Sequence, residues 1–317
     1  MSRGGRADVA LLRRAVAQIE AKAGFSSASR ARPARRMAVA RAFDPALGGG
    51  LAEDGLHEIA PAEPQDGPAA MGFALALAAR FLDLRPASAL MIGESFASLE
   101  AGALYGPGLV AHGLPLSRLV FVSAPDANAA FWATEEALKS GAPAAVVVEV
   151  WNLRSYGLMA SRRLLIAARK GGTPALLVLA GGYGQADKLS TAATTRFEIA
   201  AAPSAKSPAA AGRDLPGPFA CTARLVKARS AGAVDRPSTD GRSGDRPMDR
   251  GGGLSEAALQ ADRDQRSRLQ NHDYWRDATR AVRLVWRNEE RCFDDPAISL
   301  ALASASGDRP GAASERR

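Results

Sequence analysis

The sequence predicts an α/β protein whose mostly parallel β-sheet is flanked by helices. Between 51 and 203, short apolar segments alternate with longer segments that have helical periodicity. The apolar segments are continuous rather than alternating, as in "AAVVVEV" (144–150), and such runs are typical of strands buried on both faces. Strands that alternate with helices favour a parallel sheet covered on both sides.

The core elements follow from this alternation. The segment "LMASRRLLIAARKGG" (158–172) has the periodicity of an amphipathic helix and ends in glycine, a common helix stop. We predict strands over 56–60, 88–93, 118–124, 144–150, 174–180 and 195–200, and helices over 67–82, 126–141 and 158–172, with 96–112 partly helical.

The regions outside 51–203 differ from the core in composition. Residues 1–24 predict an amphipathic helix with an apolar stripe of Val9, Leu12, Val16 and Ile19, which packs either on its own domain or on a partner. The remaining predictions are a linker over 25–50, a linker over 204–218, C-terminal hairpin strands over 219–229 and 281–293, a disordered and partly helical insertion over 230–280, and a disordered tail over 294–317.

Composition argues against several kinds of protein. Two cysteines and three scattered histidines are too few for a disulfide framework or structural zinc, so we expect no metal. We find no run of about 18–20 uncharged apolar residues and no secretory signal, which predicts a cytoplasmic protein without a membrane partner. The net charge of +8 is compatible with a nucleic-acid partner, although much of it lies near the two ends of the chain.

The turn before the first core helix resembles a phosphate-binding loop with the wrong residues. Laid on the template G-x-x-x-x-G-K-[ST], the segment "AEPQDGPA" (62–69) has Gly67 at the last glycine, Pro68 at the lysine and Ala69 at the hydroxyl position. Pro68 removes both the cation and a backbone N–H, while Gly67 still permits a tight turn into the helix. Glu63 and Asp66 add negative charge where a triphosphate would lie. We therefore expect neither ATP hydrolysis nor any bound cofactor at this loop.

Two acidic residues lie at or near the ends of predicted strands. Glu94 follows the strand over 88–93, and Glu149 lies near the end of the strand over 144–150. In a nucleotide hydrolase such positions carry catalytic or metal-binding carboxylates. Without a phosphate cradle they have no substrate to act on, and we find no independent catalytic set of Ser, His, Cys and Asp residues.

Three long stretches resemble the ImuA family, the RecA-like accessory proteins of bacterial SOS mutagenesis cassettes. They are "GLHEIAPAEPQDGPAAMGFALALAARF", "YGPGLVAHGLPLSRLVFVSAPDANAAFWATEEALKSGAPAAVVVEVW" and "ASRRLLIAARKGGTPALLVL". The resemblance covers roughly 50–203, extends weakly to the N-terminal helix and to "AVRLVWRNEERCF", and is closest to the alphaproteobacterial type. The order and spacing of the motifs are more specific than any one of them.

The resemblance implies a RecA-like core with a degenerate phosphate loop at Gly67, Pro68 and Ala69. It implies that Glu94 matches the recombinase's catalytic glutamate and Glu149 its metal-binding acid. The segments matching the two DNA-binding loops, 151–157 and 181–191, are short. We expect at most weak single-strand contacts there, from Arg154, Tyr156, Tyr183 and Lys188.

The resemblance also implies a function without catalysis. ImuA-like proteins act with an ImuB-like protein and an error-prone C-family DNA polymerase, and RecA is a further candidate partner. We therefore predict a non-catalytic adaptor in SOS-induced translesion DNA synthesis. Two alternatives stay open: a residual nucleotide-binding protein or ATPase that uses Glu94 and Glu149, and a cell-division inhibitor of the SulA type.

Overall fold

The computed structural model describes residues 35–100, 102–204, 217–229 and 280–295. Its strands are β1 (Arg36–Met37), β2 (Leu51–Ala52), β3 (Leu56–Pro61), β4 (Ala89–Glu94), β5 (Leu119–Ala124), β6 (Ala145–Val150), β7 (Ala175–Leu179), β8 (Thr195–Ala201), β9 (Ala220–Ala228), β10 (Val282–Arg287) and β11 (Cys292–Asp294). Its helices are α2 (Gly67–Leu84), α3 (Ser95–Glu100), α4 (Gly106–Ala111), α5 (Ala127–Ser140) and α6 (Leu158–Gly171), with short 3-10 turns η1 (Pro64–Asp66), η2 (Leu116–Arg118) and η3 (Leu153–Ser155).

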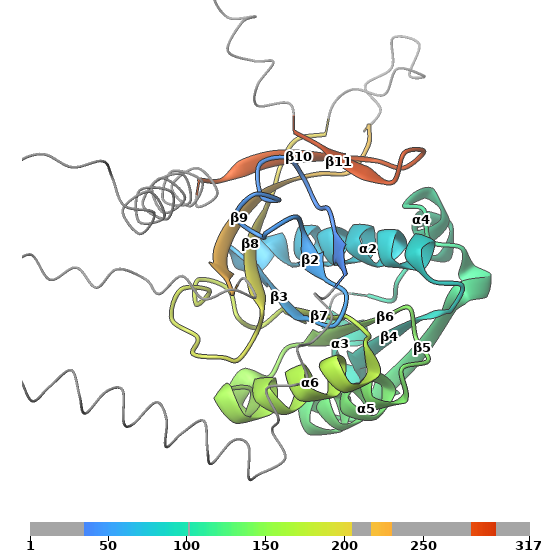
Figure 1. Ribbon diagram of the computed structural model, residues 1–317, viewed down its shortest axis with the longest axis vertical. Coiled ribbons are helices and arrows are strands. Elements are labelled where there is room, and N and C mark those ends of the chain that lie inside the picture. The colour runs from blue at the N-terminus through green and yellow to red at the C-terminus, as the bar shows by residue number, and fades with distance from the viewer. Residues whose placement is uncertain (1–34, 101, 205–216, 230–279, 296–317) are drawn as a thin grey trace, which may run out of the picture. The chain divides into compact units, whose positions relative to one another are not determined.

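Nine of these strands form one sheet, in the order β11-β10-β9-β8-β3-β7-β6-β4-β5 (Figure 1). The six strands from β8 to β5 in that order all run parallel. β9, β10 and β11 extend the sheet as antiparallel strands beyond β8. The prediction of an α/β protein with a mostly parallel sheet is confirmed, and this architecture is consistent with a RecA-like fold.

Helices cover both faces of the parallel sheet (Figure 1). α2 packs on one face, where its alanine, leucine and phenylalanine side chains form a core with β3, β6, β7 and β8. α5 and α6 pack beside each other on the other face, in a second core with β4, β6 and β7. Both helices end at left-handed glycines, Gly141 (φ 65°) and Gly172 (φ 62°), as their sequences indicate.

One helix of the described residues meets the length and hydropathy criteria for a membrane-spanning helix. The segment Pro64–Leu84 is long and apolar enough to cross a bilayer by length and composition, with a mean hydropathy of 1.3 in its best window. That window is 67% buried within the protein, and the core helix of a soluble protein passes the same test. The burial of α2 against the sheet accounts for its apolar composition.

Residues 36–50 correct one prediction, because we expected 25–50 to be a linker. Val39, Phe43 and Leu47 are buried, and Phe43 packs edge-on against Phe197 of β8 with ring centroids 5.4 Å apart. The Arg36 guanidinium donates hydrogen bonds to the carbonyl oxygens of Leu47 (2.6 Å) and Gly50 (3.0 Å). The segment is therefore part of the α2-side core, although its sequence has no extended period.

The C-terminal strands join the main sheet. β9 and β10 pair in antiparallel fashion, as predicted for 219–229 and 281–293, but the second segment consists of two strands with a turn between them. Trp286 of β10 stacks on His112, and its indole N–H donates to the His112 carbonyl oxygen (3.1 Å). The polar run 288–291 forms the turn, where Arg291 has a positive φ of 45°.

Several predictions lie outside the described residues. These are the N-terminal helix over 1–24 with Val9, Leu12, Val16 and Ile19, the first part of the linker over 25–50, nearly all of the linker over 204–218, the insertion over 230–280 apart from Arg280, and the tail beyond Asp295.

Candidate functional site

The turn at the carboxyl end of β3 is where a RecA-like protein would hold a nucleotide. Here η1 leads directly into α2, and Asp66 closes the turn with a buried side chain. Its Oδ2 accepts the backbone N–H of Glu63 (3.1 Å), and its Oδ1 accepts the backbone N–H of Ala201 at the end of β8 (2.8 Å). A carboxylate of the protein thus binds backbone donors at the place where a phosphate loop presents its donors to an anion.

The three residues of the degenerate loop have ordinary helical roles. Gly67 has φ −49° and ψ −49°, a conformation that any residue adopts, so the turn into α2 is tight but does not depend on glycine. Pro68 lies exposed in the first turn of α2, where its missing N–H removes no helical hydrogen bond. Ala69, at the hydroxyl position of the template, is buried in the α2-side core.

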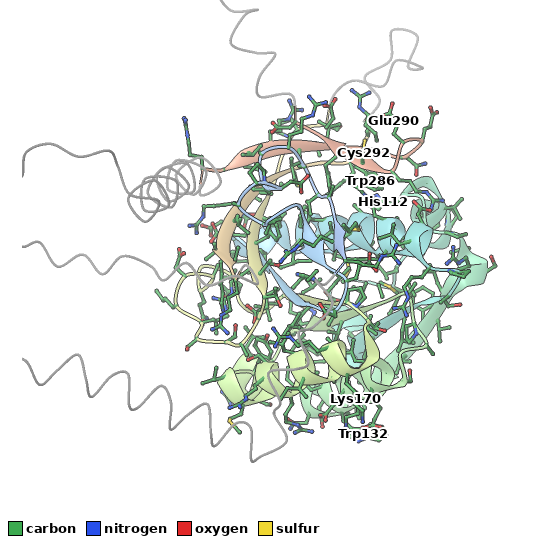
Figure 2. All side chains as sticks on the ribbon, viewed as in Figure 1. His112, Trp132, Lys170, Trp286, Glu290 and Cys292 are labelled. Atoms are coloured by element: carbon green, nitrogen blue, oxygen red, sulfur yellow. The ribbon has the colours of Figure 1, made fainter. Side chains whose placement is uncertain are left out.

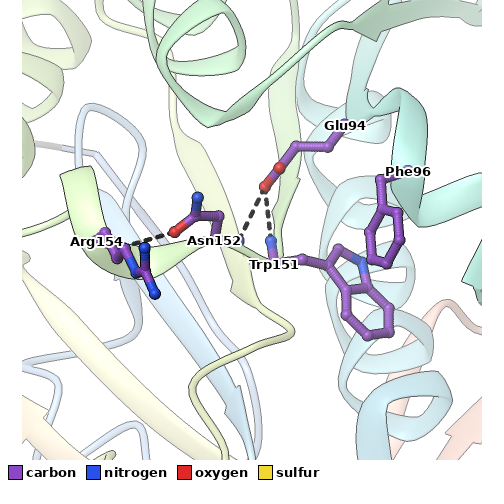
Figure 3. A pocket seen from close by; sticks show the side chains of 5 residues that line it. All are labelled: Glu94, Phe96, Trp151, Asn152 and Arg154. Atoms are coloured by element: carbon purple, nitrogen blue, oxygen red, sulfur yellow. Dashed lines mark hydrogen bonds between the residues drawn. The ribbon is translucent and has the colours of Figure 1, made fainter.

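Glu94 has a structural role at the carboxyl end of β4. Its Oε1 accepts the backbone N–H groups of Trp151 (2.7 Å) and Asn152 (3.2 Å), as Figure 3 shows. These bonds hold the start of the segment that follows β6 against the end of β4. An oxygen that already accepts two backbone donors is poorly placed to activate a water molecule.

Glu149 lies on β6 beside Gly93 of β4, so the structure brings it next to Glu94. Burial raises the pKa of Glu149, and the charge of Glu94 raises it further, while the nearby Trp151 side chain lowers it. The indole Nε1 of Trp151 is buried and makes no hydrogen bond of ordinary geometry. Glu94 is buried and Glu149 is half-buried, and the raised pKa of Glu149 disfavours two charged carboxylates side by side. Among the described residues no group of three or more His, Cys, Asp or Glu side chains could hold a metal ion.

A shallow hollow of about 470 Å³ lies beside Glu94 (Figure 3). It is lined by Glu94, Phe96, Trp151, Asn152 and Arg154. The rings of Phe96 and Trp151 meet edge to face, with centroids 6.3 Å apart. The hollow is open to solvent and places an aromatic wall next to a cation, so a planar group could stack in it.

The four predicted DNA contacts divide into two groups. Arg154, Tyr183 and Lys188 are exposed, on two segments that the structure brings together. A Cβ added to Gly181 would lie 1.9 Å from the carbonyl oxygen of Trp151, so glycine is needed where the segments touch. Their contact with DNA stays a prediction.

Tyr156 corrects the prediction. It is buried, its ring packs on Phe131 with centroids 5.4 Å apart, and its hydroxyl donates to a carboxylate oxygen of Glu58. Burial first, and the Glu58 charge second, raise the pKa of this hydroxyl well above its usual range. A ring enclosed in this way cannot stack on a base.

Sequence reasoning missed the buried ion pair behind Tyr156. The Nε of Arg196 in β8 donates to Oε2 of Glu58 in β3 (2.6 Å), and both side chains are fully buried. Three further guanidinium N–H groups donate to the carbonyl oxygens of Ala186 and Leu189 and to the Thr191 hydroxyl. The pair thereby ties the 181–191 segment to the sheet. A charged residue inside each of two apolar strands was the available signal.

Comparison with known proteins gives two curated relatives at 30% identity. No protein-family profile matches the chain. Protein ImuA from two strains of Caulobacter vibrioides is 30% identical to the chain over 169 residues, which is 51% of this chain and 66% of each relative, slightly less than two thirds. Among solved structures, SulA from Pseudomonas aeruginosa is 21% identical and covers 39% of this chain and 96% of its own, but the TM-score of 0.32 is too low to carry an argument.

These relatives support an ImuA-family relationship for this chain.

Proposed function

We propose that the chain is a non-catalytic RecA-like adaptor of SOS-induced, error-prone translesion DNA synthesis in the bacterial cytoplasm. In this role it bridges an ImuB-like protein and an error-prone C-family DNA polymerase, with RecA as a further partner. The similarity to ImuA supports a place in the mutagenesis cassette. The identities of the partners come from the family resemblance alone.

One observation carries the non-catalytic part of the proposal: Asp66 binds the backbone N–H groups of Glu63 and Ala201. A triphosphate bound at this turn would have to displace a carboxylate that is already hydrogen-bonded and buried. It would also meet no lysine, since Pro68 stands at that position. Glu94, which would be the catalytic acid, supports backbone geometry instead.

The test compares the wild type and one variant in a strain that lacks its own copy of this gene. We expect wild-type protein and Glu94→Gln to restore damage-induced mutation frequency equally, because the glutamine oxygen still accepts the two backbone N–H groups. Purified wild-type protein should show no Mg-ATP turnover above a no-protein control. Loss of mutagenesis with Glu94→Gln, together with ATP turnover by the wild type, would establish the residual ATPase instead.

A second measurement addresses the loop directly. The double variant Pro68→Lys, Ala69→Thr restores the two side chains that the template requires. We expect it to remain unable to bind Mg-ATP in isothermal titration, because Asp66 still binds the backbone donors. Tight ATP binding by this variant would show that the loop lacks only side-chain chemistry.

A further inference from the structure

The outer surface of α6 has a regular arrangement of apolar and basic side chains that the proposed function does not explain. Met159 and Ile166 are exposed and seven residues apart, with relative exposures of 73% and 56%. Arg162 and Arg169 repeat the same spacing on one side of them, and Arg163 and Lys170 repeat it on the other. Seven residues are about two helical turns, or about 10 Å along the axis, so the two members of each pair lie in one row along the helix. The apolar row of Met159 and Ile166 therefore runs between two basic rows.

Trp132 of α5 adds a third apolar side chain to this surface, with 63% of its area exposed. α5 and α6 lie beside each other, with Arg163 ion-paired to Glu135, one turn after Trp132. Figure 2 shows Trp132 and Lys170 on the same outer side of the α5 and α6 layer. We call this set the α6 outer surface, made of Trp132, Met159, Arg162, Ile166, Arg169 and Lys170.

Three cations of this surface are unpaired within the part of the chain that the structure describes. Arg162, Arg169 and Lys170 have no acidic partner among the residues that the structure describes. By contrast, Lys139 on α5 contacts both Glu135 and Glu136. Arg169 and Lys170 lie in the last turn of α6, where cations interact favourably with the helix dipole. That interaction does not account for Arg162 or for the exposed apolar row.

The pattern selects one class of partner. A nucleic-acid backbone would pair with the cations and leave Met159, Ile166 and Trp132 without a role. A protein helix with apolar residues flanked by Asp and Glu would match both kinds of row, in the manner of a coiled-coil seam with charged flanks. Trp, Met and Arg are also the residues that protein interfaces favour.

From this complementarity we infer that the α6 outer surface binds an acidic amphipathic helix of a partner protein. The apolar residues of that helix seat against Trp132, Met159 and Ile166, and its carboxylates pair with Arg162, Arg169 and Lys170. This inference rests on the proposed adaptor function and names the surface that the adaptor uses.

The test uses a fluorescein-labelled synthetic helix with leucines three and four positions apart and glutamates on both flanks. Fluorescence anisotropy should show binding to the wild type that weakens at least about tenfold with R162E/R169E. The apolar variant Ile166→Ala, Trp132→Ala should also weaken binding. R41E is the matched control, because Arg41 is an exposed cation of the segment packed on the opposite face of the sheet, and it should bind like the wild type.

A peptide of opposite charge distinguishes lost recognition from misfolding of the R162E/R169E variant. A peptide with lysines in place of the glutamates should bind R162E/R169E better than it binds the wild type. No binding of the acidic peptide by the wild type would overturn the inference, as would equal loss with R41E. Loss of binding to a single-stranded oligonucleotide with R162E/R169E, without loss of the peptide, would assign the surface to nucleic acid and overturn it too.

The proposed function can fail separately. Capture of the ImuB-like protein by both the wild type and R162E/R169E would leave the adaptor intact and remove this surface from it. Peptide binding by a wild type that captures neither the ImuB-like protein nor the polymerase would support the surface and reject the adaptor role proposed for it.

Discussion

Charged side chains at the carboxyl ends of β3 and β4 differ in one respect from those on the outer surface of α6. Asp66 and Glu94 accept backbone hydrogen bonds that hold turns in place. Arg162, Arg169 and Lys170 have no acidic partner among the described residues. The first region occupies the position of a nucleotide site, yet the fold itself uses its polar groups. The second lies away from that position and leaves charge and apolar area available to a partner.

The difference teaches that position in a fold and availability for chemistry are separate properties. A polar group that is buried and fully hydrogen-bonded contributes to stability, and its loss should be measured as unfolding. An exposed and unpaired group contributes little to stability, and its loss should be measured as binding.

The buried pair of Glu58 and Arg196 should have the largest effect. Arg196→Met leaves the Glu58 carboxylate buried without its cation and should lower the free energy of unfolding by about 3–5 kcal/mol. Urea denaturation followed by circular dichroism measures this. Arg162→Met is the matched control and should change stability by less than about 0.5 kcal/mol. Equal effects of the two variants would contradict the contrast.

Acid should destabilise the protein through His57, which is fully buried between Thr195 (2.8 Å) and the Ala52 carbonyl oxygen (2.9 Å). Burial lowers the pKa of His57 from 6.5 to about 4. Between those pH values the unfolded chain binds the extra proton, so stability falls as the pH falls from 6.5 to 4. The integrated loss from this group is about 3 kcal/mol.

Urea midpoints across that pH window, for the wild type and for His57→Gln, isolate this contribution. The glutamine variant should be less stable at pH 7 but should lose less stability on acidification. The same pH dependence in both proteins would show that other groups cause the acid sensitivity.

Asp66 should have an intermediate effect. Asp66→Ala removes the acceptor of two backbone N–H groups and should destabilise the protein by about 1–3 kcal/mol. Asp66→Asn keeps one acceptor oxygen and should cost less. Thermal unfolding of the two variants measures the difference. Unchanged stability in Asp66→Ala would mean that the turn is free to accept a ligand.

Reversal of charge on α6 should have the smallest effect on stability. R162E/R169E should unfold within about 0.5 kcal/mol of the wild type, because both side chains are exposed. Denaturation under the buffer conditions of the peptide experiment measures this. A large loss of stability would mean that these cations support the fold, and the binding defect would then have a trivial cause.

Much of the fold could be predicted from the sequence because its signals are local. Short apolar segments predicted the strands from β3 to β8, most clearly the continuous run of β6, and the glycines that close 158–172 predicted where α6 ends. The packing of 36–50 could not be predicted, because Phe43 and Leu47 have no period and are buried only when β8 and α2 are present. Tyr156 likewise looked exposed in a short polar segment until Glu58, 98 residues away, supplied its partner.

The sequence predicted which residues the candidate site contains, but not the hydrogen bonds that they make. The missing lysine and hydroxyl at Pro68 and Ala69 are visible in the sequence, and so are the two acids Glu94 and Glu149. That Asp66 reaches Ala201, and that Glu94 holds the backbone of Trp151 and Asn152, depends on residues that are distant in the chain. In the sequence the carboxylates of Asp66 and Glu94 have no visible partners, whereas in the folded chain both accept backbone hydrogen bonds.

By itself the sequence determined the order of strands and helices, the burial of α2 and the loss of phosphate-binding side chains, because periodicity and residue type act over a few positions. Only the tertiary structure decided which charges are satisfied, since a hydrogen bond between β3 and β8 or between β4 and the end of β6 requires the sheet to be assembled. The same assembly leaves Arg162, Arg169 and the apolar row of α6 facing outward, because the buried side of that helix is already occupied by the sheet.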